Sequence, residues 1–358
     1  RSWIGCQSPS VGADFSLRKI AFPAVSDLGC LAAWPPWKIV TMRFEGPCGD
    51  SSGAEWLRGN LHAHSTLSDG WHPPQVVISE YAGRGYDFLM LSDHDVWVSP
   101  DDLARFDACG MILIPGNEIS AGGPHILHVN AGCRVDPRPD RAAVLQTIAE
   151  DAGSFAIACH PNWTGIERRD GAMAFIEHLP YSQLAALRPY AGLEIYNGVT
   201  ERLHGSALAT DKWDRLLTEG RRVWGFANDD SHRLAGHDAR KTKPDPTPLM
   251  QDDAGLGWNM VAVRERSAAA VVAALREGRF YPTTGVSIRR MVSDGSSIRV
   301  ETDDAVRISA IRETGRVFAV GDGPVLQVDA PADAAYVRFE CRGAGGKMAW
   351  TQPFFPGT

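Results

Sequence analysis

Histidine and carboxylate residues occur in short, closely spaced groups in this 358-residue chain. The groups supply nine candidate metal ligands: His62, His64, Asp69, His94, Glu118, His128, His160, Asp230 and His232. Imidazole and carboxylate groups without thiolates suit Zn²⁺, Mn²⁺ or Fe²⁺. A single His-x-His pair such as His62 and His64 is more often structural, but the accompanying groups favour a functional interpretation. We therefore predict a multinuclear metal site.

The elements that must position these residues alternate short apolar runs with helical patterns from about residue 57 to 284. Strands are predicted at 57–64, 87–92, 111–115, 126–129, 154–159, 193–196, 223–227 and 259–263, and helices at 73–84, 141–151, 208–219 and 268–277. Buried strands separated by helices indicate a parallel α/β sheet or barrel. Most of the candidate ligands stand where apolar runs end, and active sites of such folds lie at the carboxyl ends of strands.

The pattern changes after residue 284, where apolar and polar residues alternate and turn signals interrupt them. This predicts a small antiparallel β-sandwich over 285–358, preceded by a metallohydrolase-type α/β domain over 49–284. Residues 1–48 form a leader of unclear structure, without a convincing signal peptide, and we assign no function to them. The segment 233–248 is expected to be an inserted loop near the rim.

Composition excludes several classes of protein. The formal net charge of -7 argues against a dedicated nucleic-acid surface, although a short nucleotide remains compatible with it. The seven cysteines form no CxxC pair, which disfavours a zinc knuckle or a redox motif and favours a reducing, cytoplasmic location. No apolar run reaches the roughly 18 residues of a membrane span. The oligomeric state is not predictable from the sequence.

The motifs resemble those of the PHP (polymerase and histidinol phosphatase) family of metal-dependent phosphoesterases. The resemblance covers roughly 57–284 and rests on 59–70 (GNLHAHSTLSDG), Asp93-His94, 115–118 (PGNE), His160-Pro161 and Asp230-Ser231-His232, which occur in the order of the family. The segments 194–198 (EIYNG) and 275–281 and the tail near 349–353 are also similar to two-domain members. The resemblance implies a distorted (β/α)7 barrel followed by the β-sandwich.

The resemblance also implies two or three divalent ions, expected to be Zn, Mn or Fe. His62, His64, Glu118 and Asp230 would hold one ion, and Asp69, His94 and His232 a second. His128 and His160 would hold a third, bridged by Glu118. His125 is the alternative to His128, because the two are three residues apart and face opposite sides of one strand. The sequence His128-Val129-Asn130 fits the family pattern better, so His128 is preferred.

The expected reaction is hydrolysis of a phosphoester of a small phosphorylated molecule or short nucleotide. Its nucleophile would be a hydroxide that bridges the ions. The residues expected to be catalytic are His62, His64, Asp69, His94, Glu118, Asp230 and His232. Candidate phosphate-binding cations are Arg233, Arg240, Lys241, Lys243, Arg168 and Arg169. Asn162 and Asn197 would contact substrate or cap helices.

Other polar residues have simpler interpretations. Asp93, Asp95 and Asp229 would support a ligand ring or a loop. The remaining histidines that are not discussed above, His72, His178, His204 and His237, are expected on the surface. The tryptophans, Trp224 and Trp258 among them, are expected in the core rather than as stacking platforms.

Two other functions remain open. The same metal site would serve an amidohydrolase-like enzyme that acts on a non-phosphate bond, and product analysis would separate the two. The chain could instead be a binding module in which the sandwich recognises a carbohydrate or protein. Retention of full activity after removal of 286–358 would show that the sandwich is not needed for chemistry.

Overall fold

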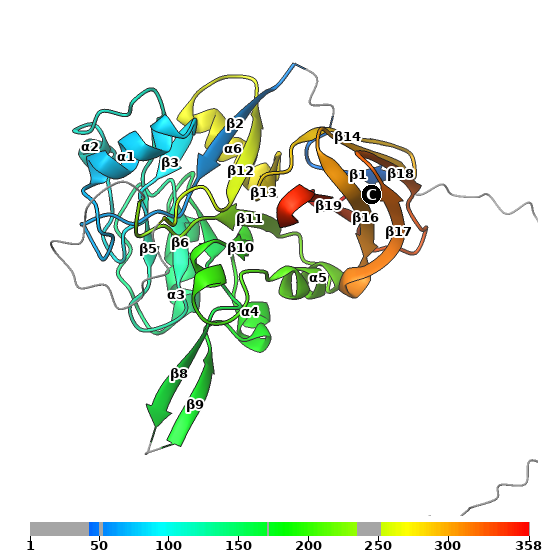
Figure 1. Cartoon of the computed structure of the whole chain (residues 1–358). Helices are drawn as coiled ribbons and strands as arrows, with labels where there is room; N and C mark the ends of the chain where they lie inside the picture. Colours follow the sequence, from blue (N-terminus) through cyan, green and yellow to red (C-terminus); the bar gives the residue numbers. More distant parts are fainter. Residues whose placement is uncertain (1–42, 50–52, 170–171, 235–251, 358) are drawn as a thin grey trace, which may run out of the picture. The chain divides into compact units, whose positions relative to one another are not determined.

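The computed structural model of the protein describes residues 43–49, 53–169, 172–234 and 252–357 (Figure 1). Within this part of the chain the fold is mixed α/β. Its largest sheet has nine strands in the order β17-β16-β19-β20-β13-β12-β2-β3-β4. These strands are β2 (Glu55–Asn60), β3 (Phe88–Met90), β4 (Ile112–Ile114), β12 (Trp258–Val263), β13 (Phe280–Thr283), β16 (Ala305–Arg312), β17 (Arg316–Asp322), β19 (Arg338–Gly343) and β20 (Met348–Trp350).

The second sheet of the α/β segment has five strands in the order β11-β10-β7-β6-β5. They are β5 (Gly116–Ile119), β6 (Ile126–Val129), β7 (Phe155–Ala158), β10 (Gly192–Asn197) and β11 (Trp224–Asn228). β7, β10 and β11 are parallel, whereas β5, β6 and β7 pair antiparallel. A fully parallel arrangement was the wrong expectation here, because the connection between β5 and β6 is too short for the crossover that parallel strands need.

Four of the six described α-helices lie close to the predicted positions, and the short helices at 100–103 and 181–186 were not predicted. The helices are α1 (Pro74–Gly83), α2 (Pro100–Leu103), α3 (Arg141–Glu150), α4 (Tyr181–Ala186), α5 (Thr210–Thr218) and α6 (Ala268–Glu277), with the short 3-10 turn η1 (Val199–Arg202). Local chemistry sets their ends. Proline occupies the first turn of α1, and Asp140 accepts from the N–H groups of Ala142 and Ala143 at the start of α3. Gly278 ends α6 in the left-handed conformation.

The C-terminal segment is antiparallel throughout the strands described, as the alternation predicted. Besides the strands in the large sheet, β14 (Ile288–Asp294), β15 (Ser297–Thr302) and β18 (Val325–Asp329) form a three-stranded sheet. Ile298, Val300, Ile308 and Phe339 belong to its apolar core. β1 (Phe44–Glu45) pairs with β21 (Phe355–Pro356), so the end of the predicted leader belongs to this fold.

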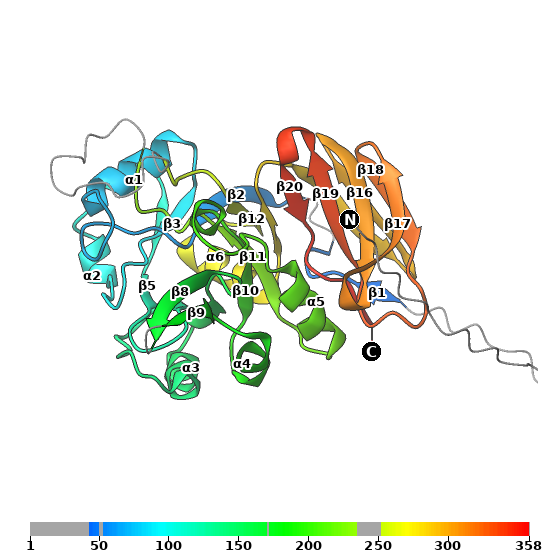
Figure 2. The same cartoon turned by 60° about the horizontal axis from the view of Figure 1, so that its bottom comes forward.

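The C-terminal strands also contact the α/β segment. α5 lies between β10 and these strands (Figure 2). Arg338 on β19 pairs with Asp214 on α5, with Nη2 to Oδ2 at 2.7 Å, and both side chains are buried. Tyr336 donates its hydroxyl to Asp214 Oδ1 at 2.7 Å. Residues 41–358 group as one structural unit.

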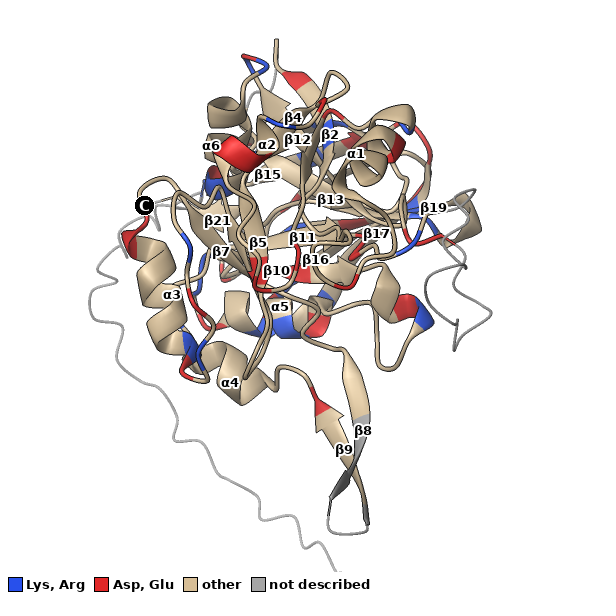
Figure 3. Cartoon of the chain, turned by 90° about the vertical axis from the view of Figure 1, so that its left-hand side faces the viewer, with Lys and Arg blue, Asp and Glu red and all other residues tan. Residues whose placement is uncertain are grey.

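A two-stranded hairpin of β8 (Thr164–Arg169) and β9 (Ala172–Glu177) was not predicted. It projects from the neighbouring elements in Figures 1 and 3. Figure 3 also shows acidic and basic segments interspersed over the face drawn. Among the described helices, none is long and apolar enough to cross a membrane. Of the predicted inserted loop, only Arg233 and Leu234 lie within the described residues.

Candidate metal centre

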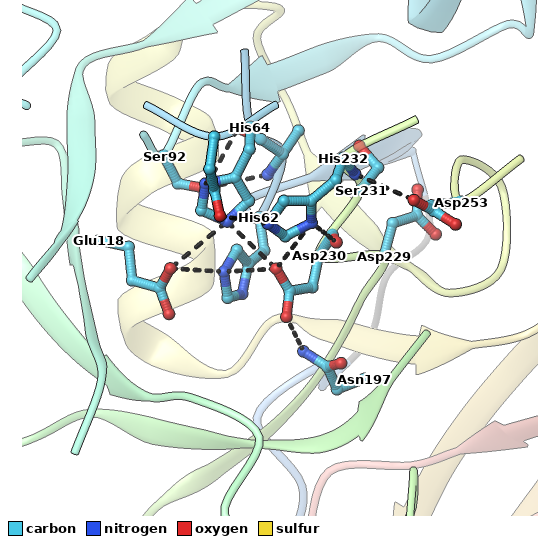
Figure 4. A network of polar contacts seen from close by, with 12 residues as sticks. His62, His64, Ser92, Glu118, Asn197, Asp229, Asp230, Ser231, His232 and Asp253 are labelled. Atoms are coloured by element: carbon cyan, nitrogen blue, oxygen red, sulfur yellow. Dashed lines mark hydrogen bonds and ion pairs between the residues drawn. The ribbon is translucent and has the colours of Figure 1, made fainter. Parts of the chain in front are cut away.

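Glu118 on β5 lies at the centre of the site and is fully buried. Its two oxygens contact five imidazoles. Oε2 lies 3.2 Å from His62 Nε2, 3.4 Å from His64 Nε2 and 2.9 Å from His94 Nδ1, and Oε1 lies 2.9 Å from His125 Nδ1 and 3.2 Å from His160 Nε2. One carboxylate thus joins residues that follow β2, β3 and β7 with the residue that precedes β6. Figure 4 shows Glu118 beside His62 and His64.

Asp230, which follows β11, provides a second carboxylate. Its Oδ1 lies 3.2 Å from His62 Nε2 and 3.1 Å from His64 Nε2, and its Oδ2 lies 3.9 Å from His160 Nε2. Asp230 and His160 both have positive φ, at 55° and 25°. Non-glycine residues rarely adopt this conformation, and it is concentrated at functional sites.

Asp69 forms a second group with three histidines. Its Oδ2 lies 3.4 Å from His232 Nε2 and 3.7 Å from His94 Nε2, and its Oδ1 lies 3.7 Å from His64 Nδ1. The ligand atoms of these four residues lie within 4.8 Å of one another. The structure therefore brings together the residues that the sequence assigned to a second ion, with His64 as an additional neighbour.

A third group contains His125, His160 and His178, whose ligand atoms also lie within 4.8 Å of one another. The backbone N–H of His125 donates to His178 Nε2 at 2.9 Å. His178 was expected on the surface, and that expectation was wrong because β9 returns it to the site. His72, which was likewise expected on the surface, is buried and accepts from Leu234 N–H at 3.2 Å, whereas His204 is exposed.

His128 does not reach the site. It is buried on the other face of β6, where its Nε2 lies 3.1 Å from Asp151 Oδ2. The strand register explains this placement, because Glu118 pairs with Leu127 and Asn117 pairs with His128. Directly paired residues project from the same face, and residues 125 and 127 share that face by the two-residue period. His125 therefore takes the position that the sequence analysis gave to His128.

Nearby charges set the ionisation of the central groups. Burial alone would lower the pKa of His62, but the charges of Asp230 and Glu118 hold it well above its ordinary value. Burial also opposes ionisation of Glu118 and Asp230, yet the charge of His62 holds both carboxyl pKa values well below the ordinary range. Against burial, the hydrogen bond with Asp69 raises the pKa of His232 to about 9. These pKa shifts share one cause, which is that the carboxylates of the centre attract positive charge.

The donor atoms fit divalent cations. His62 Nε2, His94 Nδ1 and Glu118 Oε2 are buried without a hydrogen-bond partner among the described residues. Glu118 Oε2 lies 3.2 Å from His62 Nε2 and 2.9 Å from His94 Nδ1. Buried polar atoms are normally satisfied, and nitrogen and oxygen atoms that converge without hydrogen bonds are suited to coordinate a cation.

Glu194 on β10 is a buried member of the site that the sequence analysis quoted in a motif without assigning it a role. Its Oε1 lies 2.8 Å from His62 Nδ1 and accepts from Asn228 at 2.9 Å. Its Oε2 accepts from the backbone N–H of His160 at 2.8 Å and from Asn197 at 2.9 Å. Glu194 thus connects the ends of four strands beneath the central group.

The flanking aspartates support loops. Asp93 accepts from the backbone N–H groups of Ser65 and Ser68 at 2.8 and 3.0 Å. Asp95 accepts from the N–H of Ser120 at 2.8 Å. Asp229 accepts three backbone N–H groups at 2.7–2.9 Å, from Gly255, Leu256 and Gly257. These contacts fit the loop interpretation of the three residues.

A cavity of about 300 Å³ opens above the three groups. Its lining includes the candidate ligands Asp69, His94, His125, His160, Asp230 and His232, together with Trp71, Trp163, Val199, Thr200, Leu203 and Arg233. The Arg233 guanidinium lies over the Trp71 ring at 4.0 Å from its centroid. Trp71 and Trp163 are therefore not core residues, contrary to expectation.

The asparagines expected to contact substrate do not line this cavity. Asn162 donates to Leu208 O at 2.8 Å and to Asp211 Oδ1 at 2.9 Å, near the start of α5. Asn197 donates to Asp230 Oδ2 at 3.2 Å and accepts from Thr200. Both support the structure around the site. Arg240, Lys241, Lys243 and His237 lie outside the described residues, as do the side chains of Arg168 and Arg169.

Fold and site together define a class: an α/β protein whose strand ends gather imidazoles and carboxylates able to hold divalent metals beside an open cavity. A 3′,5′-nucleoside bisphosphate phosphatase of Chromobacterium violaceum is 37% identical to this chain over 94 residues, which are 25% of this chain and 33% of that protein. The chain thus spans about a third of the length of this curated relative. The predicted resemblance to phosphoester hydrolases is confirmed by this relative.

The chain is also similar to solved structures. A two-domain protein from Bacteroides vulgatus with a predicted PHP-like metal-dependent phosphoesterase has a TM-score of 0.47 and 17% identity, over 84% of this chain and 94% of that chain. A metal-dependent phosphoesterase of Bifidobacterium adolescentis has a TM-score of 0.32 and 18% identity, over 55% and 92%. An amidohydrolase of Chromobacterium violaceum has a TM-score of 0.30 and 18% identity, over 54% and 93%. No model of a protein family matches the chain.

Proposed function

We propose that this chain is a metal-dependent hydrolase that cleaves a phosphoester of a small phosphorylated molecule or short nucleotide. The observation that carries the proposal is the position of Glu118, which contacts five imidazoles directly below a 300 Å³ cavity. The sequence relative is a phosphatase by name and supports phosphate as the reacting group. In this proposal the α/β segment is a PHP-type distorted barrel and 285–358 a β-sandwich.

Each ion has a proposed set of ligands. His62, His64, Glu118 and Asp230 would hold the first, and Asp69, His94 and His232 the second. His125 and His160, with Glu118 as a bridge, would hold the third in place of the earlier choice of His128. Zn, Mn or Fe suits these donors, and such ions supply Lewis acidity and an activated water.

The residues of the chain itself have separate tasks. Arg233 lines the cavity beside His232 and places a guanidinium where a phosphate would need charge-assisted hydrogen bonds. The Trp71 ring restricts that guanidinium from one face. Glu194 would accept a hydrogen bond from His62 Nδ1–H, which leaves Nε2 as the nitrogen that faces the central carboxylates. Asn197 orients Asp230 from below.

The experiment that tests this function is an assay of protein loaded with Mn²⁺, Fe²⁺ or Zn²⁺ on a phosphomonoester and a phosphodiester. We expect turnover that disappears in His94→Ala and persists in His204→Ala, a control with an exposed histidine outside the cavity lining. Absence of phosphoester turnover in metal-loaded protein would contradict the proposal. Cleavage of an amide or ester alone would support the amidohydrolase-like alternative. A cytoplasmic location stays a prediction.

A further inference from the structure

Four apolar side chains border a cavity that is otherwise lined by ionisable and polar groups: Trp71, Trp163, Val199 and Leu203. Trp71 is covered on one side by Arg233. Leu203 is unusual because 42% of its surface is exposed although it borders a site. Ion binding and phosphate contact do not require such groups, so these side chains point to the organic part of a substrate.

Trp163 is held beside the third histidine group by its backbone and by ring contacts. The backbone N–H of Trp163 donates to His160 O at 2.9 Å, and the backbone carbonyl of Trp163 accepts from the backbone N–H of His178 at 2.9 Å. The indole lies 5.6 Å from the His160 ring and 5.2 Å from the His178 ring between centroids. It also lines a second cavity of about 390 Å³. The half-buried ring therefore separates two cavities and is not packed into the core.

Leu203 is placed by the η1 turn. Asn197 Oδ1 accepts from both the N–H and the hydroxyl of Thr200, at 3.1 and 2.8 Å, and Leu203 N–H donates to Thr200 O at 3.2 Å. The same asparagine donates to Asp230. The Asn197 side chain thus fixes the position of the η1 turn, and with it Leu203, relative to Asp230. This arrangement suits a substrate that contacts both Leu203 and the metal centre.

We infer that the substrates are phosphomonoesters whose organic part carries a planar aromatic or heteroaromatic ring that stacks on Trp163 and contacts Leu203. This inference rests on the proposed function, which places the phosphate at the histidine groups and Arg233. Sites of about 300 Å³ accommodate one small ligand. Aromatic side chains bind bases and similar rings through their faces, independently of the exact ring substituents. A nucleoside monophosphate meets these requirements, whereas a sugar phosphate lacks the planar aromatic ring.

The test compares adenosine 5′-monophosphate with ribose 5-phosphate, because both carry the phosphate on the 5′ primary hydroxyl of ribose and only the nucleotide carries a base. The metal-loaded protein should have a kcat/KM about 5- to 150-fold higher for the nucleotide, the factor expected from stacking one base. Trp163→Ala and Leu203→Ala should reduce this ratio, and Trp163→Phe should restore most of it. Leu208→Ala is the matched control, since Leu208 is 38% exposed and does not line the cavity.

Binding of adenosine and of ribose, measured by calorimetry, separates this inference from the proposed function. Equal kcat/KM values for the two phosphates would overturn the ring preference and leave phosphoester hydrolysis intact. Adenosine binding that Trp163→Ala weakens, without turnover of any phosphoester, would support the ring site and overturn the proposed function. Absence of both adenosine binding and turnover would overturn both.

Discussion

His62 Nδ1 and Glu194 Oε1 lie 2.8 Å apart in a fully buried pair, on the opposite edge of the imidazole from Glu118 and Asp230. A carboxylate in this position fixes the tautomer of a metal-binding histidine and increases its basicity. Glu194 also holds the backbone of His160 and the side chains of Asn197 and Asn228. Its replacement should therefore affect ion binding before it affects the fold.

Glu194→Gln should weaken divalent ion binding by about 10- to 100-fold, because the amide keeps the shape of the side chain but removes its charge. Competition with a coloured chelator measures the affinity directly. Glu150→Gln, at the exposed end of α3, provides the matched control and should bind ions like the wild type. An unchanged affinity in Glu194→Gln would show that the pair with His62 is purely structural.

His125→Ala and His128→Ala should differ in metal content although the residues are three positions apart. His125 contacts Glu118, so its removal should lower the number of ions bound or the affinity of the weakest. His128 contacts Asp151 on the other face, and its removal should leave the metal content unchanged. Elemental analysis of the two purified variants decides the matter. The reverse result would restore the original choice of His128.

His128 should make the protein sensitive to acid. Burial is the main reason that its pKa lies below its ordinary value of 6.5, and the charge of Asp151 only partly offsets this effect. The folded state then binds fewer protons than the unfolded state, so the free energy of unfolding should fall as pH drops below about 6.5. Urea unfolding of metal-free protein between pH 5 and 8 measures the slope. His128→Gln should have a shallower slope, and an identical slope would contradict this account.

Arg338 and Asp214 should stabilise the contact between the C-terminal strands and α5. Arg338→Ala leaves the Asp214 carboxylate buried without the cation that pairs with it, which should cost about 3–5 kcal/mol in the free energy of unfolding. The double change Arg338→Met with Asp214→Leu should recover much of that loss. Arg342→Ala, at a residue 60% exposed in its side chain, should have little effect. A loss in Arg338→Ala no larger than in this control would show that the pair adds no stability.

Sequence patterns predicted which candidate ligands follow strands. His62, His64, His94, His160 and Asp230 stand next to apolar runs, and strand ends of one sheet meet regardless of the details of packing. The choice between His125 and His128 depended on the register of β5 and β6, which is set by a hairpin rather than by periodicity.

Glu194, His178 and Trp163 show why the remainder was not foreseen. Every residue of β10 is buried, Glu194 included, and nothing in the spacing of Glu194 along the sequence relates it to His62. His178 and Trp163 meet only because the unpredicted β8–β9 hairpin returns the chain to its starting point. Contacts of this kind depend on tertiary structure, and a local sequence pattern carries no signal for them.

The measurement that tests the central claim most directly is elemental analysis of the wild type and of Glu118→Gln, each purified without chelators and after incubation with Mn²⁺, Fe²⁺ or Zn²⁺. Because Glu118 contacts all three groups of candidate ligands, we predict two or three equivalents of divalent metal in the wild type and a large loss in the variant. A wild-type protein that retains no metal under any of these conditions would contradict the assignment of these residues to a metal centre.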